Sequence, residues 1–138
     1  MIILDTNVIS ELVRAEPNRT FMTRIRGFRS EKLCTTAITE AELRAGLERL
    51  PEGRKSVGLK LDIDEMLENV LGSRILPFDT AAAKAYAVLL AKRIAEGRAI
   101  GIFDIQIAGI VQTLGATFVT RNTTDFEDCG FEVINPWK

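Results

Sequence analysis

The start of the chain is an apolar run that ends abruptly in an acid and two polar residues. Residues 1–4 read MIIL, and Asp5, Thr6 and Asn7 follow them directly. This pattern is typical of a buried strand whose last residue reaches the carboxyl-end edge of a sheet. Ligands of open α/β sheets bind at that edge. Because a charged residue directly after a buried strand must be solvated, paired or ligated, Asp5 is the leading candidate for a functional residue.

Strand and helix patterns alternate along the rest of the chain. Further strands are predicted at residues 32–36, 74–79, 116–120 and 131–134. Helices are predicted at residues 7–13, 17–28, from 38 onward, 61–71, 80–96 and 104–114, with 100–103 as a short approach to the last helix. Strands that alternate with helices indicate a parallel sheet. The predicted fold class is therefore α/β, with a short central parallel sheet covered by helices on both faces.

Polar residues at the predicted helix starts fit the role of N-caps. Thr6 or Asn7 suits the first helix, Thr39 suits the third, and Asp79 suits the helix 80–96. Pro17 is expected to open the second helix. Apolar stripes predict which helix faces are buried, and these stripes comprise Phe21, Ile25 and Phe28, then Tyr86, Leu89, Leu90 and Ile94, then Ile107, Ala108, Val111 and Leu114.

Length and composition indicate one ordinary globular domain over residues 1–138. The chain is 46% hydrophobic and 27% charged, which excludes a disordered chain. No apolar stretch approaches the roughly 20 residues of a membrane helix, and the N-terminus lacks the basic region of a signal peptide, so the expected location is the cytoplasm. The net charge of -1 argues against a generally basic nucleic-acid-coating surface, although a local basic rim stays possible.

The chain contains no histidine, which removes the usual general base, the usual zinc ligand and every Ser-His or Cys-His dyad. Cys34 and Cys129 lie far apart in sequence and form no CxxC pair, so neither a zinc site nor a disulfide framework is expected. Catalysis by such a chain must use carboxylates, a hard metal ion, or both.

Acidic residues recur where a strand has just ended or a helix begins. Asp5, Glu42, Asp104 and the turn 122–125 all occupy such places, and in a parallel sheet these places share one edge. Converging carboxylates repel one another and raise their own pKa values unless a divalent cation lies between them. Ligation by oxygen alone suits Mg²⁺ or Mn²⁺.

Each of these acids also has a structural interpretation. Thr39 and Glu42 fit a capping box, in which Glu42 would satisfy a backbone N–H and do no chemistry. Asp104 suits the first turn of a helix because the macrodipole favours a carboxylate there. The turn at Asn122 and Asp125 is also ordinary loop chemistry. The polar groups of Thr6, Asn7 and Thr120 either orient carboxylates and water or only cap and terminate elements.

The chain resembles PIN-domain ribonucleases, specifically the VapC and FitB type toxins of bacterial toxin-antitoxin modules. The likeness runs nearly end to end and is carried by several segments in the same order. These segments are Leu4-Asp5-Thr6-Asn7, Ala41-Glu42-Leu43-Arg44-Ala45-Gly46, Asp104 followed by Ile107-Ala108, Thr120-Arg121-Asn122-Thr123-Thr124-Asp125-Phe126, and Asn135-Pro136-Trp137.

The resemblance implies metal-dependent cleavage of RNA in an acidic pocket that binds Mg²⁺ or Mn²⁺. By position, the family's acids fall on Asp5, Glu42 and Asp104, and the fourth falls on Asn122, where many relatives have Asp. Asp125 could compensate through a water, or the site works with one ion. A water activated by the metal would supply the nucleophile, and Arg121 is expected to contact the scissile phosphate.

The resemblance also implies protein partners. Toxins of this type form homodimers and are silenced by a small VapB- or FitA-like antitoxin, with which they assemble into larger hetero-oligomers. The helix face of Phe21, Ile25 and Phe28 could contact such a partner or belong to the core.

Two other functions compete with the nuclease. A Mg²⁺-dependent phosphotransfer or phosphatase-type domain also places acids at strand tips, but a phosphatase expects a second Asp at the position of Asn7, and a receiver-like domain expects a lysine where Arg121 follows Thr120. The other is a catalytically impaired PIN-fold binding protein, to which Asn122 is the pointer.

Overall fold

A five-stranded sheet forms the centre of the computed structural model, which describes residues 1–99 and 101–138. The strand order is β3-β2-β1-β4-β5, and every pairing is parallel. The strands are β1 Ile2–Leu4, β2 Leu33–Thr36, β3 Ile75–Leu76, β4 Thr117–Val119 and β5 Val133–Ile134. The predicted short parallel sheet is confirmed.

The register of the sheet brings the carboxyl ends of its strands into line. Leu4 of β1 lies opposite Val119 of β4, which in turn lies opposite Ile134 of β5. The backbone N–H of Asp5 continues this ladder by donating to the carbonyl of Val119 at 3.0 Å. The residues that follow β1, β4 and β5 therefore meet at one edge, as they do in open α/β sheets generally.

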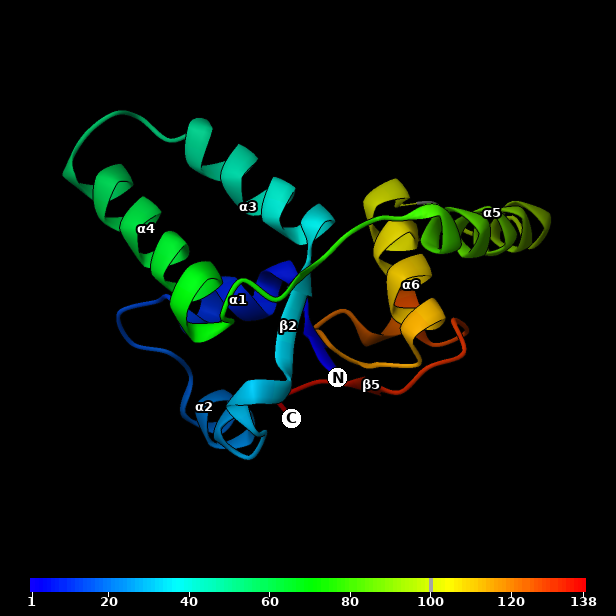
Figure 1. Ribbon diagram of the computed structural model, residues 1–138, viewed down its shortest axis with the longest axis horizontal. Coiled ribbons are helices and arrows are strands. Elements are labelled where there is room, and N and C mark those ends of the chain that lie inside the picture. Colours follow the sequence, from blue (N-terminus) through cyan, green and yellow to red (C-terminus); the bar gives the residue numbers. More distant parts are fainter. Residues whose placement is uncertain (100) are drawn as a thin grey trace.

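Helices cover both faces of this sheet (Figure 1). The helices are α1 Thr6–Leu12, α2 Arg19–Arg26, α3 Ala37–Glu48, α4 Arg54–Glu65, α5 Thr80–Ala95 and α6 Ile102–Leu114. Ile3 and Phe118 point into a core with α5 and α6, whereas Leu4 and Val119 point into a second core with α1 to α4. This division follows from the alternation of side chains along a strand. The predicted coverage on both faces is confirmed.

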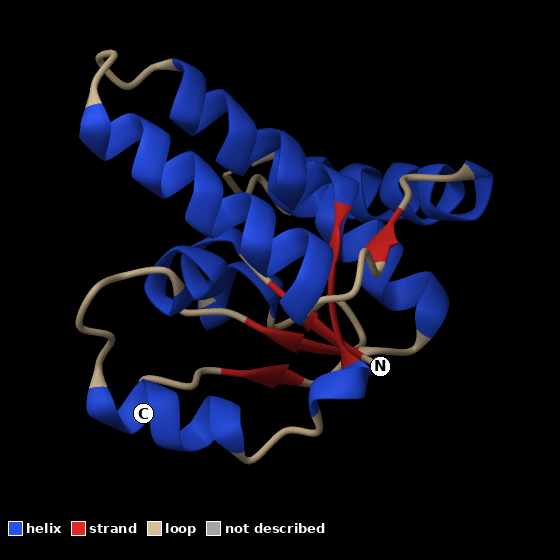
Figure 2. Cartoon of the chain, turned by 60° about the vertical axis from the view of Figure 1, so that its left-hand side comes forward, coloured by secondary structure: helices blue, strands red, loops and turns tan. Residues whose placement is uncertain are grey.

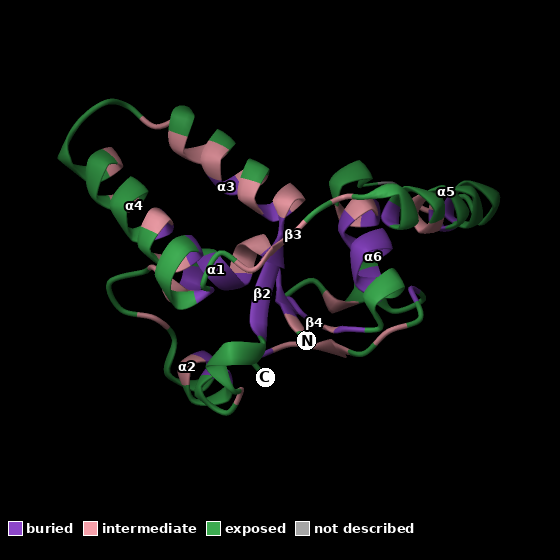
Figure 3. Ribbon diagram, in the orientation of Figure 1, coloured by how far each residue is buried: buried purple, intermediate pink, exposed green. Residues whose placement is uncertain are grey.

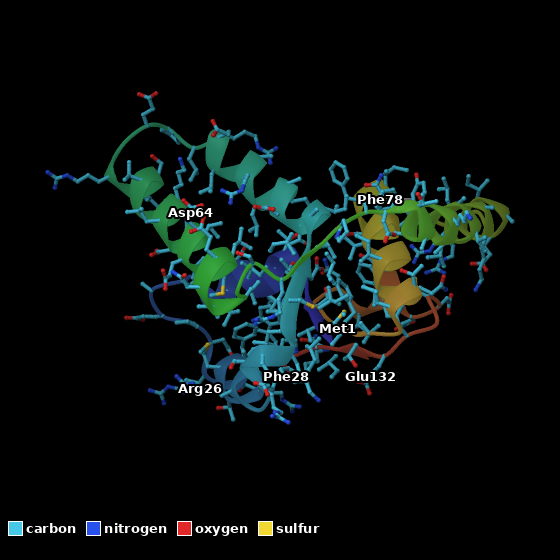
Figure 4. The ribbon with its side chains drawn as sticks, in the orientation of Figure 1. Met1, Arg26, Phe28, Asp64, Phe78 and Glu132 are labelled. Atoms are coloured by element: carbon cyan, nitrogen blue, oxygen red, sulfur yellow. The ribbon has the colours of Figure 1, made fainter. Side chains whose placement is uncertain are left out.

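Helices α3 and α4 form a hairpin that extends beyond the sheet (Figure 2). Its connection is exposed, whereas β2 and the inner face of α6 are buried (Figure 3). Arg44 of α3 joins the two helices, because its guanidinium donates to Asp64 of α4 at 3.0 Å, and it also pairs with Glu40 of α3 at 2.9 Å. The side chain of Asp64 is labelled in Figure 4. Arg44 thus braces the hairpin.

The predicted caps of the first and third helices are wrong. Asp5 itself caps α1, since its Oδ1 accepts from the backbone N–H of Thr6 at 2.7 Å. Thr36, the last residue of β2, caps α3 and accepts from the backbone N–H of Thr39 at 3.0 Å. In both cases the strand passes directly into the helix, so the last strand residue or its neighbour takes the capping position.

Two other helix starts also differ from the sequence interpretation. Helix α2 is capped by Asn18, whose Oδ1 accepts from Phe21 N–H at 3.0 Å, so Pro17 lies just before the helix and does not open it. Asp79 caps α5 as predicted, accepting from Ala82 N–H at 2.9 Å. Helix α4 begins at Arg54, ahead of the predicted start at residue 61, and passes into a π-helical turn at Met66–Val70.

The predicted buried stripes need two corrections. Ile94 and Leu114 are exposed, with 59% and 45% of their surfaces accessible, and Arg93 takes the inward position on α5. Arg93 follows Leu89 by four residues and therefore lies on the same helix face. Of the predicted approach 100–103, Ile100 lies outside the described residues, and Ile102 and Phe103 already belong to α6. No described helix is both long and apolar enough to span a membrane.

The contact between α5 and α6 depends on a glycine. A Cβ at Gly109 would lie 2.7 Å from the carbonyl oxygen of Ala82 and 3.1 Å from the backbone nitrogen of Tyr86. We therefore expect Gly109→Ala to lower the free energy of unfolding by about 1–3 kcal/mol, because the helices must separate. Urea denaturation measures this change.

The matched control is Gly58→Ala on α4, where an added Cβ meets nothing within 4 Å. This substitution should raise the free energy of unfolding by up to about 1 kcal/mol, since alanine is the better helix former. Equal stability of the two variants would contradict the proposed role of Gly109.

Candidate active site

Asp5 lies at the carboxyl end of β1 and is 4% exposed. Its Oδ2 accepts a hydrogen bond from the hydroxyl of Thr120 at 2.7 Å, and the side-chain amide of Asn7 donates to the same oxygen at 3.4 Å. Burial raises the pKa of Asp5, while the hydrogen bonds from Thr120 and from the Thr6 backbone act in the opposite direction. The carboxylate is thus buried, oriented by its neighbours and short of a positive partner.

Glu42 lies in α3 and faces the same edge of the sheet. The hydroxyl of Thr6 donates to its Oε1 at 3.2 Å. Burial raises the pKa of Glu42, and the negative charges of Asp5 and Asp104 raise it further. The capping box with Thr39 is wrong, because Thr39 lies inside the helix that Thr36 caps. Glu42 is therefore available for chemistry.

Asp104 lies in the first turn of α6 and is half-buried. Burial, followed by repulsion from Asp5 and Asp125, raises the pKa of its carboxyl group to about 6, although the charge of Arg93 counteracts this. A Cβ at Gly101 would lie 3.1 Å from Oδ2 of Asp104. Glycine at this position leaves room for the carboxylate.

The turn after β4 brings Asp125 toward the other acids. The negative charge of Asp125 raises the pKa of both Asp5 and Asp104, which places it within electrostatic reach of both carboxylates. Asn122 and Asp125 are both exposed, and the backbone N–H of Asn122 donates to the Thr120 hydroxyl at 3.1 Å. Asp125 is therefore the charged contribution of this turn.

Two grooves meet at Glu42. One, of about 410 Å³, lies between α1, α3 and α4 and is mainly apolar, with Val13, Leu43, Leu47, Leu50 and Ile63 in its lining. The other, of about 860 Å³, includes Arg49 and the exposed Phe103. Thr6 and Glu42 belong to both linings. Both grooves therefore give access to Glu42, whereas Asp5, Asp104 and Asp125 line neither of them.

Comparison with known families settles the relationship of the chain. The family model described as "PIN domain" matches residues 2–132. The chain belongs to the PIN-domain family. It is 44% identical to the plasmid stability protein StbB of Pseudomonas syringae and 41% identical to a VapC ribonuclease of Sinorhizobium fredii, covering all of this chain and 99% of each relative.

Solved structures agree with this assignment. The PIN domain superposes on FitB-containing complexes, one of them described as FitAcB from Neisseria gonorrhoeae, with a TM-score of 0.86, 37% identity and 99% coverage of both chains. A complex described as FitAB bound to a DNA fragment gives a TM-score of 0.90 at 35% identity, covering 100% of this chain and 96% of that one. The predicted family resemblance is confirmed.

The PIN domain has a buried cation beneath its acidic edge that sequence reasoning missed. Arg93 of α5 is 7% exposed, and its Nη2 donates to the backbone carbonyl of Asp125 and lies 3.5 Å from Sγ of Cys129. No carboxylate forms an ion pair with Arg93 in the described part of the chain. Arg93 anchors the turn that carries Asp125. The sequence signal that could have found Arg93 is its position four residues after Leu89, which places it on the buried face of α5.

The donor groups of the PIN domain fit a hydrated divalent cation. All of them are oxygens, and burial and neighbouring negative charges raise the pKa of Asp5, Glu42 and Asp104, an effect that a bound cation would counteract. Within residues 1–99 and 101–138, no group of three or more acidic, histidine or cysteine side chains is placed so that it could hold a metal ion. Mg²⁺ commonly keeps several waters and uses only one or two carboxylates, so a closed cluster is not required.

The raised pKa of Asp104 predicts how the stability of the metal-free PIN domain depends on pH. The folded chain holds the proton of Asp104 up to about pH 6, whereas an unfolded Asp releases it near pH 4. The stabilisation is therefore complete below about pH 4 and is lost as the pH rises through about 6. Measuring the free energy of unfolding in EDTA across this pH range should show the loss of this stabilisation.

The variant Asp104→Asn removes this titration and also relieves the repulsion that raises the pKa of Glu42. The free energy of unfolding of the natural chain minus that of the variant should fall between about pH 4 and pH 7. A difference that stays flat or rises over this range would contradict the raised pKa.

Proposed function

We propose that this PIN domain acts as one unit over residues 1–138 and is a metal-dependent endoribonuclease toxin of a toxin-antitoxin module. The observation that carries the proposal is the convergence of Asp5, Glu42, Asp104 and Asp125 on one edge of the sheet in a chain without histidine. The relatives named VapC ribonuclease and Toxin FitB support it, at 41% and 36% identity over nearly the whole chain.

The proposed metal ligands are Asp5, Asp104 and Glu42, and the ion is Mg²⁺ or Mn²⁺. When bound, such an ion neutralises the pocket and lowers the pKa of a water molecule. The Thr120 hydroxyl and Thr6 backbone fix both oxygens of Asp5. Thr6 also holds Glu42 through its hydroxyl, so that Glu42 can orient water for attack on the phosphodiester.

The fourth acidic position is proposed to be Asp125 and not Asn122. Asp125 acts electrostatically on Asp5 and Asp104, whereas the amide of Asn122 carries no charge. The buried guanidinium of Arg93 holds the carbonyl of Asp125 in place. This arrangement compensates for the loss of an acid at position 122.

An antitoxin is the proposed protein partner. Relatives solved as FitAcB and as VapBC-1 of Haemophilus influenzae are complexes by name. The apolar groove between α1, α3 and α4 would accept an apolar segment of a VapB- or FitA-like partner, next to Glu42. Phe21 and Ile25 belong to the core and leave little surface for this role. We further propose a homodimer, a larger assembly with the antitoxin, and a cytoplasmic location where RNA is accessible.

The rival functions have less support. A phosphatase would need a second acid at position 7, and Asn7 instead donates hydrogen bonds from its amide to Asp5 and Thr120. Three relatives carry the names VapC ribonuclease, Toxin FitB and tRNA(fMet)-specific endonuclease VapC, and a fourth is named a plasmid stability protein; none of these names describes phosphotransfer. A catalytically impaired binding protein would be indicated by the loss of an essential acid. Although position 122 is Asn, the nearby Asp125 supplies a negative charge that acts on Asp104.

Removal of a ligand charge should abolish RNA cleavage. Loss of a residue that only hydrogen-bonds to a metal ligand typically costs roughly 10- to 100-fold in activity. We expect Asp5→Asn to reduce the rate of cleavage by more than this, and EDTA to stop cleavage by the natural chain. A gel assay of total RNA with Mg²⁺ or Mn²⁺ measures both effects. The matched control is Asp79→Asn, which makes the same substitution at a helix cap where Asn is equally suitable. Intact RNA with every metal would overturn the proposal.

Paired substitutions in the turn test the fourth position. Asp125→Asn should weaken Mn²⁺ binding by about 10-fold, because it removes a charge near the ion, whereas Asn122→Ala should leave the affinity unchanged. Asn122 holds the turn through its backbone, which the substitution keeps. Calorimetric titration with Mn²⁺ gives both affinities. The opposite ranking would assign the position to Asn122.

A further inference from the structure

The side chain of Arg121 rests on an aromatic ring. Its guanidinium carbon lies 4.9 Å from the centroid of the indole of Trp137. Trp137 is itself held in place, because its ring packs 4.6 Å from that of the fully buried Phe21 and its backbone N–H donates to Oδ1 of Asn135 at 2.9 Å. The planar cation therefore sits on a fixed support.

This pair lies at the same edge of the sheet as the acidic residues. Arg121 is the second residue after β4 and directly follows Thr120. Its backbone N–H donates to Oδ1 of Asn7 at 3.2 Å. Trp137 follows β5, which pairs with β4 in parallel. Neighbouring strands lie about 4.8 Å apart, so the end of β5 is roughly 10 Å from the end of β1. A nucleotide next to a phosphate at Asp5 can span this distance.

The electrostatics of Arg121 are also informative. No ion pair between Arg121 and an acidic side chain is present in the described part of the chain. The ring of Trp137 holds the guanidinium instead. The exposed cation is thereby left for a substrate.

We propose that Arg121 on Trp137 forms a nucleobase-binding subsite, in which a base of single-stranded RNA stacks on the guanidinium plane next to the cleaved phosphate. The proposal rests on the ribonuclease function proposed above. Unpaired RNA bases commonly stack on aromatic rings and on arginine planes. A phosphate contact alone would need only a positive charge, whereas a guanidinium held over an aromatic ring suits a flat ligand. Arg121 thus positions the substrate and acts neither as a metal ligand nor as a general acid or base.

The test uses Trp137 as its own reporter, since it is the only tryptophan in the chain. Asp5→Asn protein, in which turnover is blocked, is titrated with a ten-residue oligoadenylate and with an abasic oligomer that carries the same phosphates. We expect the oligoadenylate to change the fluorescence of Trp137 and to bind about 10-fold more tightly than the abasic oligomer. Equal affinities for the two oligomers would overturn the subsite.

Two further substitutions separate a stack from a charge. Arg121→Lys in the Asp5→Asn background keeps the charge but loses the plane, so it should abolish the preference for bases while the salt dependence of binding stays. Trp137→Phe keeps an aromatic support and should keep the preference, measured by anisotropy of labelled oligomers. A lysine variant that still prefers the oligoadenylate would assign Arg121 to the phosphate alone.

Cleavage by the natural chain distinguishes failure of this inference from failure of the proposed function. If the natural chain cleaves RNA and Arg121→Lys shows the same base preference, only the subsite is wrong. If the natural chain cleaves no RNA under any metal, the proposed function is wrong, and the subsite fails with it.

Discussion

The carboxylate of Asp5 connects the folding of this chain with its chemistry. Its Oδ1 caps α1 and its Oδ2 accepts from Thr120, so one side chain joins the central strand, the first helix and the end of β4. The same carboxylate is buried and repels Glu42 and Asp104. Hydrogen bonds to the charged form offset part of the cost of burying it. A divalent cation would remove the remaining repulsion, so the arrangement is strained electrostatically but not geometrically.

A second set of contacts supports the acidic edge from below. Arg93 is buried among the groups of the turn, and it acts on this turn through the carbonyl of Asp125 and not through a salt bridge. A buried guanidinium without a carboxylate partner is costly in most settings. Arg93 lies close enough to Asp104 to lower the pKa of that carboxyl group, so the negative potential of the site stabilises the charge of Arg93. The acids and this cation therefore depend on each other although they form no direct ion pair.

The sequence predicted the features that depend on strong local patterns. The apolar strands, the parallel sheet, the Asp79 cap and the convergence of Asp5, Glu42 and Asp104 could be predicted, because strand edges and helix starts carry clear signals. The caps at Asp5 and Thr36 were missed because their capping role depends on where the strand stops. Arg93 and Asp125 were missed or left open, since their positions depend on packing between α5 and the turn after β4, which are distant in sequence.

The central position of β1 determines when the site can assemble during synthesis of the chain. Thr120 and Asp5, which share a hydrogen bond, are 115 residues apart. At roughly 5–20 residues per second, on the order of ten seconds pass between the synthesis of the two. The first strand also waits for β4 before both of its edges are paired. A nascent or truncated chain therefore exposes the acids without assembling them, and the site is complete only after Thr120 and the turn that follows it have been synthesised.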